Sequence, residues 1–258
     1  MKKLTLLSLI AFNATLVGCG ADDETIATEY DTSRPYYLPY EANRTRKAWQ
    51  VAGGNYSHNA TDPNTGSVIN LHAFDFAMQI GSVVVAARDG RVYHVEESET
   101  QTCGTCAGNG ILVTQGEVQS NGSVNYDGTV GSYHHLDTNK VCVEPGDIIR
   151  QGDIIALSGN TGNSSGPHLH FEVKYLNSAN AWIDPPSTLP KFVDVDAGGT
   201  GTPREYSRYT SANETGSSNT DWCTQRAITI PNQSILDSNY ETFLLESEET
   251  LSEEHEIM

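Results

Sequence analysis

Positively charged side chains are scarce in this sequence of 258 residues, which has 15 Lys and Arg against 33 Asp and Glu and a formal net charge of −18. Such a chain has no basic stripe with which to displace the counterions of a phosphate backbone, so we expect no nucleic-acid partner. The same shortage argues against polybasic docking on anionic lipid. The composition does not favour long helical bundles or coiled coils either. The length suffices for one sizeable domain with a buried core and tails.

Turn-forming residues are plentiful, with 23 Gly and 10 Pro. This composition is typical of short strands joined by turns, so we predict a mainly β, antiparallel fold of sheet or β-sandwich type with long loops. Short apolar runs of strand type cover residues 82–87, 91–95, 111–114, 148–150, 154–157 and 168–173. Asp89-Gly90 and Gly152 are turn signals between neighbouring runs, and they predict two hairpins. The polar stretch 117–131 is interpreted as a surface loop.

The N-terminus has the layout of a secretory signal: two lysines, an apolar run, and small residues that end at Cys19. The apolar run is too short for a stable membrane span. Leu16-Val17-Gly18-Cys19 also resembles a bacterial lipoprotein signal, in which cleavage before the cysteine leaves Cys19 acylated. The alternative is an ordinary signal peptide with a cysteine near its cut site. Both place the protein outside the cytoplasm. The lipid would anchor it to a membrane of the cell envelope, the outer membrane if the host has one, since Gly20 rather than Asp follows Cys19.

Changes in composition divide the chain into four parts. They are a lipoprotein signal peptide (1–18), a spacer (19–35), one domain (36–189) and a loop-rich, acidic C-terminal extension (190–258). The strand pattern ends after Pro185-Pro186. From Asp237 onward the chain is an acidic tail that we expect to be solvated, with a short helix around residues 240–251.

Four cysteines remain once Cys19 is set aside: Cys103, Cys106, Cys142 and Cys223. An even number in an oxidising compartment indicates two disulfides, with three possible pairings. Cys103 and Cys106 have redox spacing but lack the surrounding βαβ pattern, so a structural bridge, local or to a distant cysteine, is favoured. A four-cysteine zinc site is a third alternative, disfavoured because Cys142 and Cys223 are far apart.

The histidines suggest a polar site. His168 and His170 lie two residues apart on an expected strand, so both imidazoles project from one face while Phe171 and Val173 face the core. His135 belongs to a separate strand, and by alternation its neighbour His134 should point away from the site unless the strand is bulged. Asp75 lies between two phenylalanines, and an acid among core residues needs a partner, commonly a metal. His94 is interpreted as a surface or cross-strand residue, and His255 as a solvated residue of the acidic tail.

Several ordered segments resemble the lysostaphin/LytM-type zinc metallopeptidases. The resemblance covers roughly residues 36–189 and follows the family's order. Its blocks are Asp75-Phe76-Ala77-Met78 with the run 81–90, Tyr133-His134-His135-Leu136, the turn 146–152, Gly162 to Val173 with His168-Leu169-His170 at its centre, and Trp182-Ile183-Asp184-Pro185. It implies a duplicated hybrid motif of barrel-sandwich type.

By this resemblance, zinc would be held by a first-block histidine, Asp75 and His170, while His135 and His168 flank the metal-bound water. Three protein ligands leave the open position that catalytic zinc requires. The family usually has its first ligand four residues before the aspartate, where this chain has Leu71. We favour His58, which precedes a polar insertion, over His72, because residues three apart on an extended segment face opposite sides.

The function that the resemblance implies is a zinc endopeptidase of bacterial peptidoglycan, a monomer held beside the cell wall by its lipid anchor. The alternative is a non-catalytic envelope lipoprotein that activates another cell-wall hydrolase. Relatives of that kind typically lack metal ligands, whereas candidates for all positions are present here. A purely structural lipoprotein would give no reason for the matched polar residues.

Overall fold

The computed structural model describes residues 35–61, 68–104, 106–175, 187–196 and 201–215. Regular structure within these residues is entirely β, with no helix. The strands are β1 (Thr45–Gln50), β2 (Phe74–Ala77), β3 (Val83–Val85), β4 (Gly90–Glu96), β5 (Asn109–Val118), β6 (Val124–Val141), β7 (Ile148–Ile149), β8 (Ile154–Ser158), β9 (His168–Tyr175), β10 (Ser187–Thr188) and β11 (Arg208–Thr210). A search of the described residues for a helix long and apolar enough to cross a membrane finds none. Cys19, Cys223, the closing block 182–185, His255 and the acidic tail lie outside the described residues.

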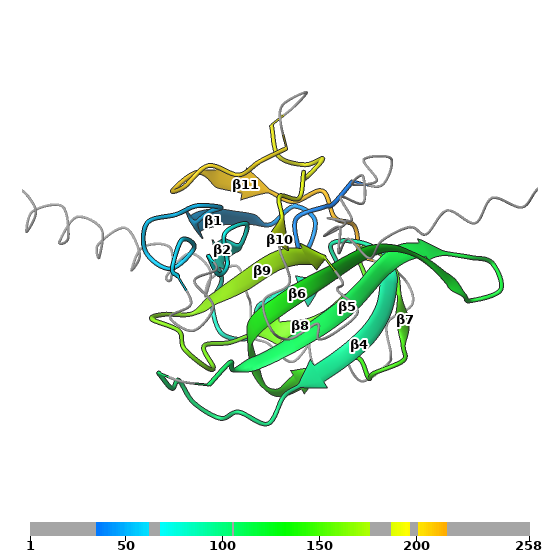
Figure 1. The fold of residues 1–258 in the computed structure, drawn as a ribbon, viewed down its shortest axis with the longest axis horizontal. Helices are drawn as coiled ribbons and strands as arrows, with labels where there is room; N and C mark the ends of the chain where they lie inside the picture. The colour runs from blue at the N-terminus through cyan, green and yellow to red at the C-terminus, as the bar shows by residue number, and fades with distance from the viewer. Residues whose placement is uncertain (1–34, 62–67, 105, 176–186, 197–200, 216–258) are drawn as a thin grey trace, which may run out of the picture.

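Antiparallel pairing joins the strands into one sheet in the order β11-β1-β2-β9-β6-β5-β4-β7. In Figure 1, β9, β6, β5 and β4 run side by side as a curved layer, and β1 and β11 lie beyond β9. Strand β10 pairs with β9, while β8 pairs with both β3 and β6. The prediction of a mainly β, antiparallel fold is confirmed.

The two predicted hairpins are wrong, although their turns are present. Strand β3 pairs with β8 and β4 pairs with β7, so neither turn joins strands that pair with each other. Instead the two turns bond to one another: the Gly152 amide donates to the Ala86 carbonyl (2.9 Å), and the Gln151 amide donates to Asp89 Oδ1 (2.8 Å). Each run changes layers at its turn, where these cross-bonds satisfy the backbone. Two similar strand–turn–strand units therefore interlock, as the duplicated motif implies.

The expected loop at 117–131 is instead the end of a long hairpin. Strand β5 continues to Val118 and β6 begins at Val124. Between them Gly122 adopts a positive φ of 81°, and the Gln119 amide donates to the Ser123 carbonyl (2.8 Å). The segment is polar because its outer residues, such as Asn125, are exposed. The dipeptide Asn121-Gly122 favours a tight turn of this kind between two antiparallel strands.

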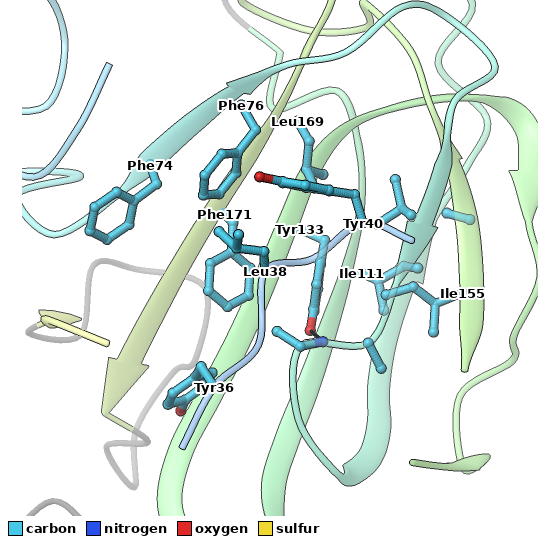
Figure 2. Close-up of a cluster of buried hydrophobic side chains, with 14 of the residues drawn as sticks. Tyr36, Leu38, Tyr40, Phe74, Phe76, Ile111, Tyr133, Ile155, Leu169 and Phe171 are labelled. Atoms are coloured by element: carbon cyan, nitrogen blue, oxygen red, sulfur yellow. Dashed lines mark hydrogen bonds between the residues drawn. The ribbon is translucent and has the colours of Figure 1, made fainter. Parts of the chain in front are cut away.

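The core contains many aromatic side chains, and two of them, Tyr36 and Tyr40, come from the segment just before β1. Tyr36, Leu38 and Tyr40 are fully buried and pack with Phe76 and Phe171 (Figure 2). The Tyr40 and Phe76 rings lie 5.5 Å apart, and those of Tyr36 and Phe171 6.2 Å. These edge-on contacts anchor β2 and β9 from their inner faces.

Strand β9 separates the core from the polar site. Leu169, Phe171 and Val173 are fully buried in the core, as predicted, and the alternate residues His168 and His170 occupy the opposite face. The site is thus built on the outer side of a strand whose inner side is packed with apolar residues.

The described part of the C-terminal extension belongs to the same domain. Phe192 is 1% exposed in the main core, and β11 pairs with β1. The Asn213 side-chain amide donates to the carbonyls of Leu38 (3.0 Å) and Ala86 (3.1 Å). The domain therefore continues past the expected boundary at residue 189, because the few apolar residues of this turn-rich segment fill the core.

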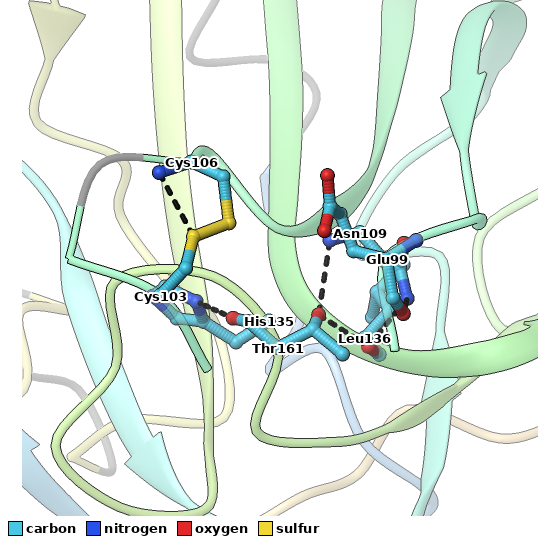
Figure 3. The surroundings of a disulfide bond; sticks show 7 residues. All are labelled: Glu99, Cys103, Cys106, Asn109, His135, Leu136 and Thr161. Atoms are coloured by element: carbon cyan, nitrogen blue, oxygen red, sulfur yellow. Dashed lines mark hydrogen bonds between the residues drawn. A yellow bond between two sulfur atoms is a disulfide. The ribbon is translucent and has the colours of Figure 1, made fainter. Parts of the chain in front are cut away.

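Cys103 and Cys106 form a local disulfide (Figure 3). This was one of the open pairings, and it overturns the alternative of a four-cysteine zinc site. Cys142 is disulfide-bonded as well.

Candidate metal and catalytic site

The register between β2 and β9 brings Asp75 directly opposite His170. His170 Nδ1 lies 2.9 Å from Asp75 Oδ1, and His168 Nε2 lies 3.5 Å from the same oxygen. All three residues are less than 9% exposed. Pairing of two strands far apart in the sequence thus assembles this half of the site.

His58 reaches the same carboxylate from the segment after β1. Its Nδ1 donates to the Val51 carbonyl (3.0 Å), which leaves Nε2 unprotonated in the neutral ring, 3.2 Å from Asp75 Oδ2. The His58 residue is fully buried, and its ring lies 5.3 Å from that of His170. The polar insertion after His58 does not prevent it from joining Asp75.

This cluster fits a divalent metal. One donor atom each from His58, Asp75 and His170 lies within 4.8 Å of the others. His58 Nε2 is buried and forms no well-aligned hydrogen bond among the described residues; its neighbour is the Asp75 carboxylate 3.2 Å away, and a metal ion held by both would satisfy them. Two imidazole nitrogens and a carboxylate oxygen are donors that zinc accepts, with a fourth position left open.

The histidines around Asp75 set its protonation state. Burial alone would raise the pKa of Asp75, but the charge of His168 and the hydrogen bonds of His170 and His58 hold that pKa well below its usual value. Burial likewise lowers the pKa of His58, yet the neighbouring Asp75 carboxylate outweighs it and raises that pKa. The carboxylate therefore stays ionised and available as a ligand.

Two further histidines face the cluster. The His135 and His168 rings lie 4.5 Å apart. His135 Nδ1 donates to the Thr161 carbonyl (2.8 Å) and His168 Nδ1 donates to the Gly166 carbonyl (2.7 Å), so in the neutral rings both Nε2 atoms are proton acceptors. Burial, with the nearby charges of His168 and His170, lowers the pKa of His135 to about 3, and burial lowers that of His168 too. Both rings are therefore neutral.

His134 lines the cleft instead of pointing away from it, because β6 has the bulge that was the one exception to the expected alternation. Gly110 pairs with His134 and Asn109 with Leu136, so His135 is an extra residue in β6. It adopts a positive φ of 60°, and this bulge lets both histidines line the cleft. The position opposite must be glycine, since a Cβ on Gly110 would lie 2.7 Å from His134 Nδ1.

His72, the alternative first ligand, lies outside the cluster of metal-type donors. Its Nδ1 is 3.0 Å from the Ser187 hydroxyl, and it belongs to neither group of close donors among the described residues. Leu71, at the family's usual ligand position, is 36% exposed. His94 is half-buried on β4, paired with Leu112.

Gln50 is a site residue that motif spacing did not reveal. Its side-chain amide nitrogen donates to Asp75 Oδ2 (3.0 Å), and its oxygen accepts from the Ser57 amide (2.8 Å). The residue is 6% exposed at the end of β1. It therefore joins the carboxylate to the segment that carries His58.

These residues line a cleft of about 730 Å³. Trp49, Tyr56 and Tyr206 line it together with Cys106 and Asn163. Tyr206 comes from the C-terminal segment, beyond the predicted domain boundary at residue 189. The cleft is large enough for an extended peptide to reach the histidines.

Comparison with known proteins finds a match to the model described as peptidase family M23 over residues 70–185, which contain Asp75, His135, His168 and His170 but not His58. The peptidoglycan DD-endopeptidase ShyB of Vibrio cholerae is 33% identical over 131 residues, 51% of this chain and 26% of that protein. Lysostaphin of Staphylococcus simulans is 33% identical over 133 residues, 51% of this chain and 24% of that protein. The matched segments thus span about a quarter of these relatives. Among solved structures, a zinc-containing peptidase from Vibrio cholerae is 28% identical with a TM-score of 0.37, covering 59% of this chain and 41% of that one.

Proposed function

Because residues 70–185 match the model of peptidase family M23, we propose that this protein is a zinc-dependent endopeptidase that hydrolyses peptide bonds of bacterial peptidoglycan. One observation carries the proposal: Asp75, His170 and the two neutral histidines line a single cleft, and buried His58 completes a group of three metal-type donors with Asp75 and His170. The relatives support the substrate class, since one is named a peptidoglycan DD-endopeptidase and another, from Staphylococcus capitis, a glycyl-glycine endopeptidase.

His58 Nε2, a carboxylate oxygen of Asp75 and His170 Nδ1 would hold the zinc. When bound, zinc supplies Lewis acidity, which polarises the scissile carbonyl and lowers the pKa of a water ligand to about 7. Asp75 offsets the ion's charge, and the Val51 carbonyl keeps the donor nitrogen of His58 unprotonated. Such outer partners fix ring orientation and raise ligand basicity.

His135 and His168 act on the proton of the attacking water. Each ring keeps its Nδ1 proton on a backbone carbonyl, so Nε2 accepts a proton and the resulting imidazolium stabilises the developing oxyanion. The same group then returns the proton to the leaving amine. The rings are in contact, so either can take the first step.

A non-catalytic activator of another hydrolase is disfavoured by the complete donor set. We further propose that Cys19 carries the lipid and anchors the protein in the cell envelope, beside its substrate. Metabolic labelling with radioactive palmitate should mark the full chain and leave Cys19→Ser unlabelled. Equal labelling of the full chain and of Cys19→Ser would contradict lipid attachment at Cys19.

The direct test uses the purified chain from residue 20 onward. We expect about one zinc per chain and digestion of purified sacculi, with both lost after chelation and restored by added zinc. Sacculi with direct cross-links and sacculi with glycine bridges separate the two kinds of bond. His170→Ala should lose zinc and activity, whereas the matched variant His94→Ala, outside the cleft, should keep both. Normal digestion by His170→Ala, or a chain that purifies without zinc and cannot take it up, would overturn the proposal.

A further inference from the structure

His135 has a conformation that needs external support. A positive φ of 60° is uncommon for a residue other than glycine, and such strain persists only where neighbouring groups hold it. Two bonds hold this residue, and both come from the turn after β8. The Gly159 amide donates to the His135 carbonyl (2.9 Å), and the Thr161 carbonyl accepts the His135 Nδ1 proton (2.8 Å). The position of this turn therefore sets the direction of the ring.

A buried hydrogen-bond network fixes the turn to the strand that carries the bulge. The Thr161 hydroxyl donates to the Leu136 carbonyl (2.8 Å) and accepts from the Asn109 amide (2.9 Å). The Asn109 side-chain amide donates to the carbonyls of Glu99 (2.9 Å) and Leu136 (3.3 Å). Asn109 is 0% exposed and Thr161 5%, so water does not readily replace these bonds. Figure 3 shows both residues beside His135.

The disulfide lies on the other side of the same turn. The Cys103 amide donates to the Gly162 carbonyl (2.7 Å), and the Cys106 carbonyl accepts from the Asn163 amide (3.1 Å). The two bonded cysteines thus contact the turn immediately after Thr161. The approach is close, because a Cβ on Gly162 would lie 2.6 Å from the Gly108 Cα. Cys106 also lines the cleft. The disulfide and its two bonds to the turn, here called the clamp, are therefore next to the reacting groups.

We propose that Thr161 and Asn109, clamped by the Cys103–Cys106 disulfide, are positioning residues that hold His135 in its working orientation. The inference rests on the proposed function of His135 as a proton acceptor. Neither residue touches substrate. Their effect passes through the Thr161 carbonyl to the ring, so it should alter turnover and leave zinc binding unchanged.

Thr161→Val tests the network, because valine has the shape of threonine but lacks the hydroxyl. We expect kcat on peptidoglycan peptides to fall on the order of tenfold to a hundredfold, with KM and zinc content unchanged. Thr161→Ser, which keeps the hydroxyl, should restore most of the turnover. Thr114→Val is the matched control, since that hydroxyl donates to the Arg91 carbonyl (3.1 Å) in β4, away from His135. Equal losses in Thr161→Val and Thr161→Ser, or no loss in either, would overturn the proposal.

A second readout does not depend on activity. The His135 Nδ1 proton, held by a carbonyl, should give a resolved downfield imidazole signal in the NMR spectrum of the zinc-loaded chain. The signal should be lost or broadened in Thr161→Val and present in Thr161→Ser and Thr114→Val. An inactive wild type with this pattern would refute the proposed function and leave the positioning intact. An unchanged signal in Thr161→Val would refute the positioning itself.

The clamp is tested with the double variant Cys103→Ser/Cys106→Ser. It should lower kcat with KM and zinc content unchanged, by less than Thr161→Val because the buried network remains. If the clamp and the network act as one unit, adding Thr161→Val to this background should cost less than it does in the wild type. If the fold-changes in kcat of the two variants simply multiply when they are combined, the disulfide contributes to stability alone and does not help to position His135.

Discussion

The two halves of the cleft hold their histidines by different means. Asp75 and His170 lie directly opposite each other on β2 and β9, and the inner faces of both strands are packed with buried aromatic rings. His135 and His168 lie instead at a bulge and at a strand end, where the carbonyls of Thr161 and Gly166 orient them. Strand register therefore places Asp75 and His170 on the proposed metal side, which His58 joins from the segment after β1, and turns build the proton-accepting side.

This difference assigns different sensitivities to the two sides. Changes on the metal side should alter zinc content and with it all activity, because a missing donor leaves the ion incompletely held. Changes on the turn side should leave zinc in place and alter only the proton transfers. Measuring zinc content and turnover together separates the two sides in every variant.

The largest effect is expected from His58→Ala. It removes one of three protein donors, so zinc should fall well below one per chain, and activity should fall by more than the roughly 100-fold that loss of an outer partner costs. His72→Ala is the matched control, since His72 contacts the Ser187 hydroxyl and lies outside both groups of close donors among the described residues. Metal analysis of the two purified variants decides the assignment. Zinc kept in the first and lost in the second would reverse it.

The sequence predicts the fold class and several of the strands, but not β1, β10 or β11, and not which strands pair. Apolar runs and turn residues mark β3, β4, β7 and β8 correctly, yet both turns connect strands that pair with other partners. A turn signal reports local backbone geometry, whereas pairing is decided by which layer each run joins. The domain boundary near residue 189 failed for a related reason. Phe192 is one of few apolar residues in a polar segment, and only tertiary packing reveals that it is core.

Alternation along β9 predicts the face shared by His168 and His170, because a regular strand has a period of two. It fails at His134, where the bulge in β6 breaks that period. Gln50 belongs to no motif. It contacts Asp75 and Ser57 because the end of β1 lies next to β2 and to the segment that carries His58. Local periodicity therefore finds donors on regular strands and misses residues placed by irregular backbone.

The second effect is expected on the turn side. His135→Ala and His168→Ala should each keep about one zinc per chain and lower turnover on the order of 100- to 10,000-fold, the usual contribution of a positioned acid or base. His94→Ala provides the control, because that half-buried histidine lies on β4 away from the cleft. Stopped digests of purified sacculi give the rates. Loss of zinc from either variant would erase the distinction between the two sides.

The smallest effect is expected at Gln50, which supports the metal side without being a donor. Gln50→Met keeps the length of the side chain but removes the bonds to Asp75 and Ser57, so the carboxylate and the His58 segment lose their link. We expect zinc affinity to weaken about 10- to 100-fold, measured by competition with a chelating dye, while turnover at saturating zinc changes little. Gln115→Met is the matched control, since Gln115 is equally buried and bonds Thr129 in the core (3.1 Å). Both variants should unfold at lower temperature, but only Gln50→Met should bind zinc more weakly. Equal zinc affinity in the two would mean that strand register alone holds Asp75 in place.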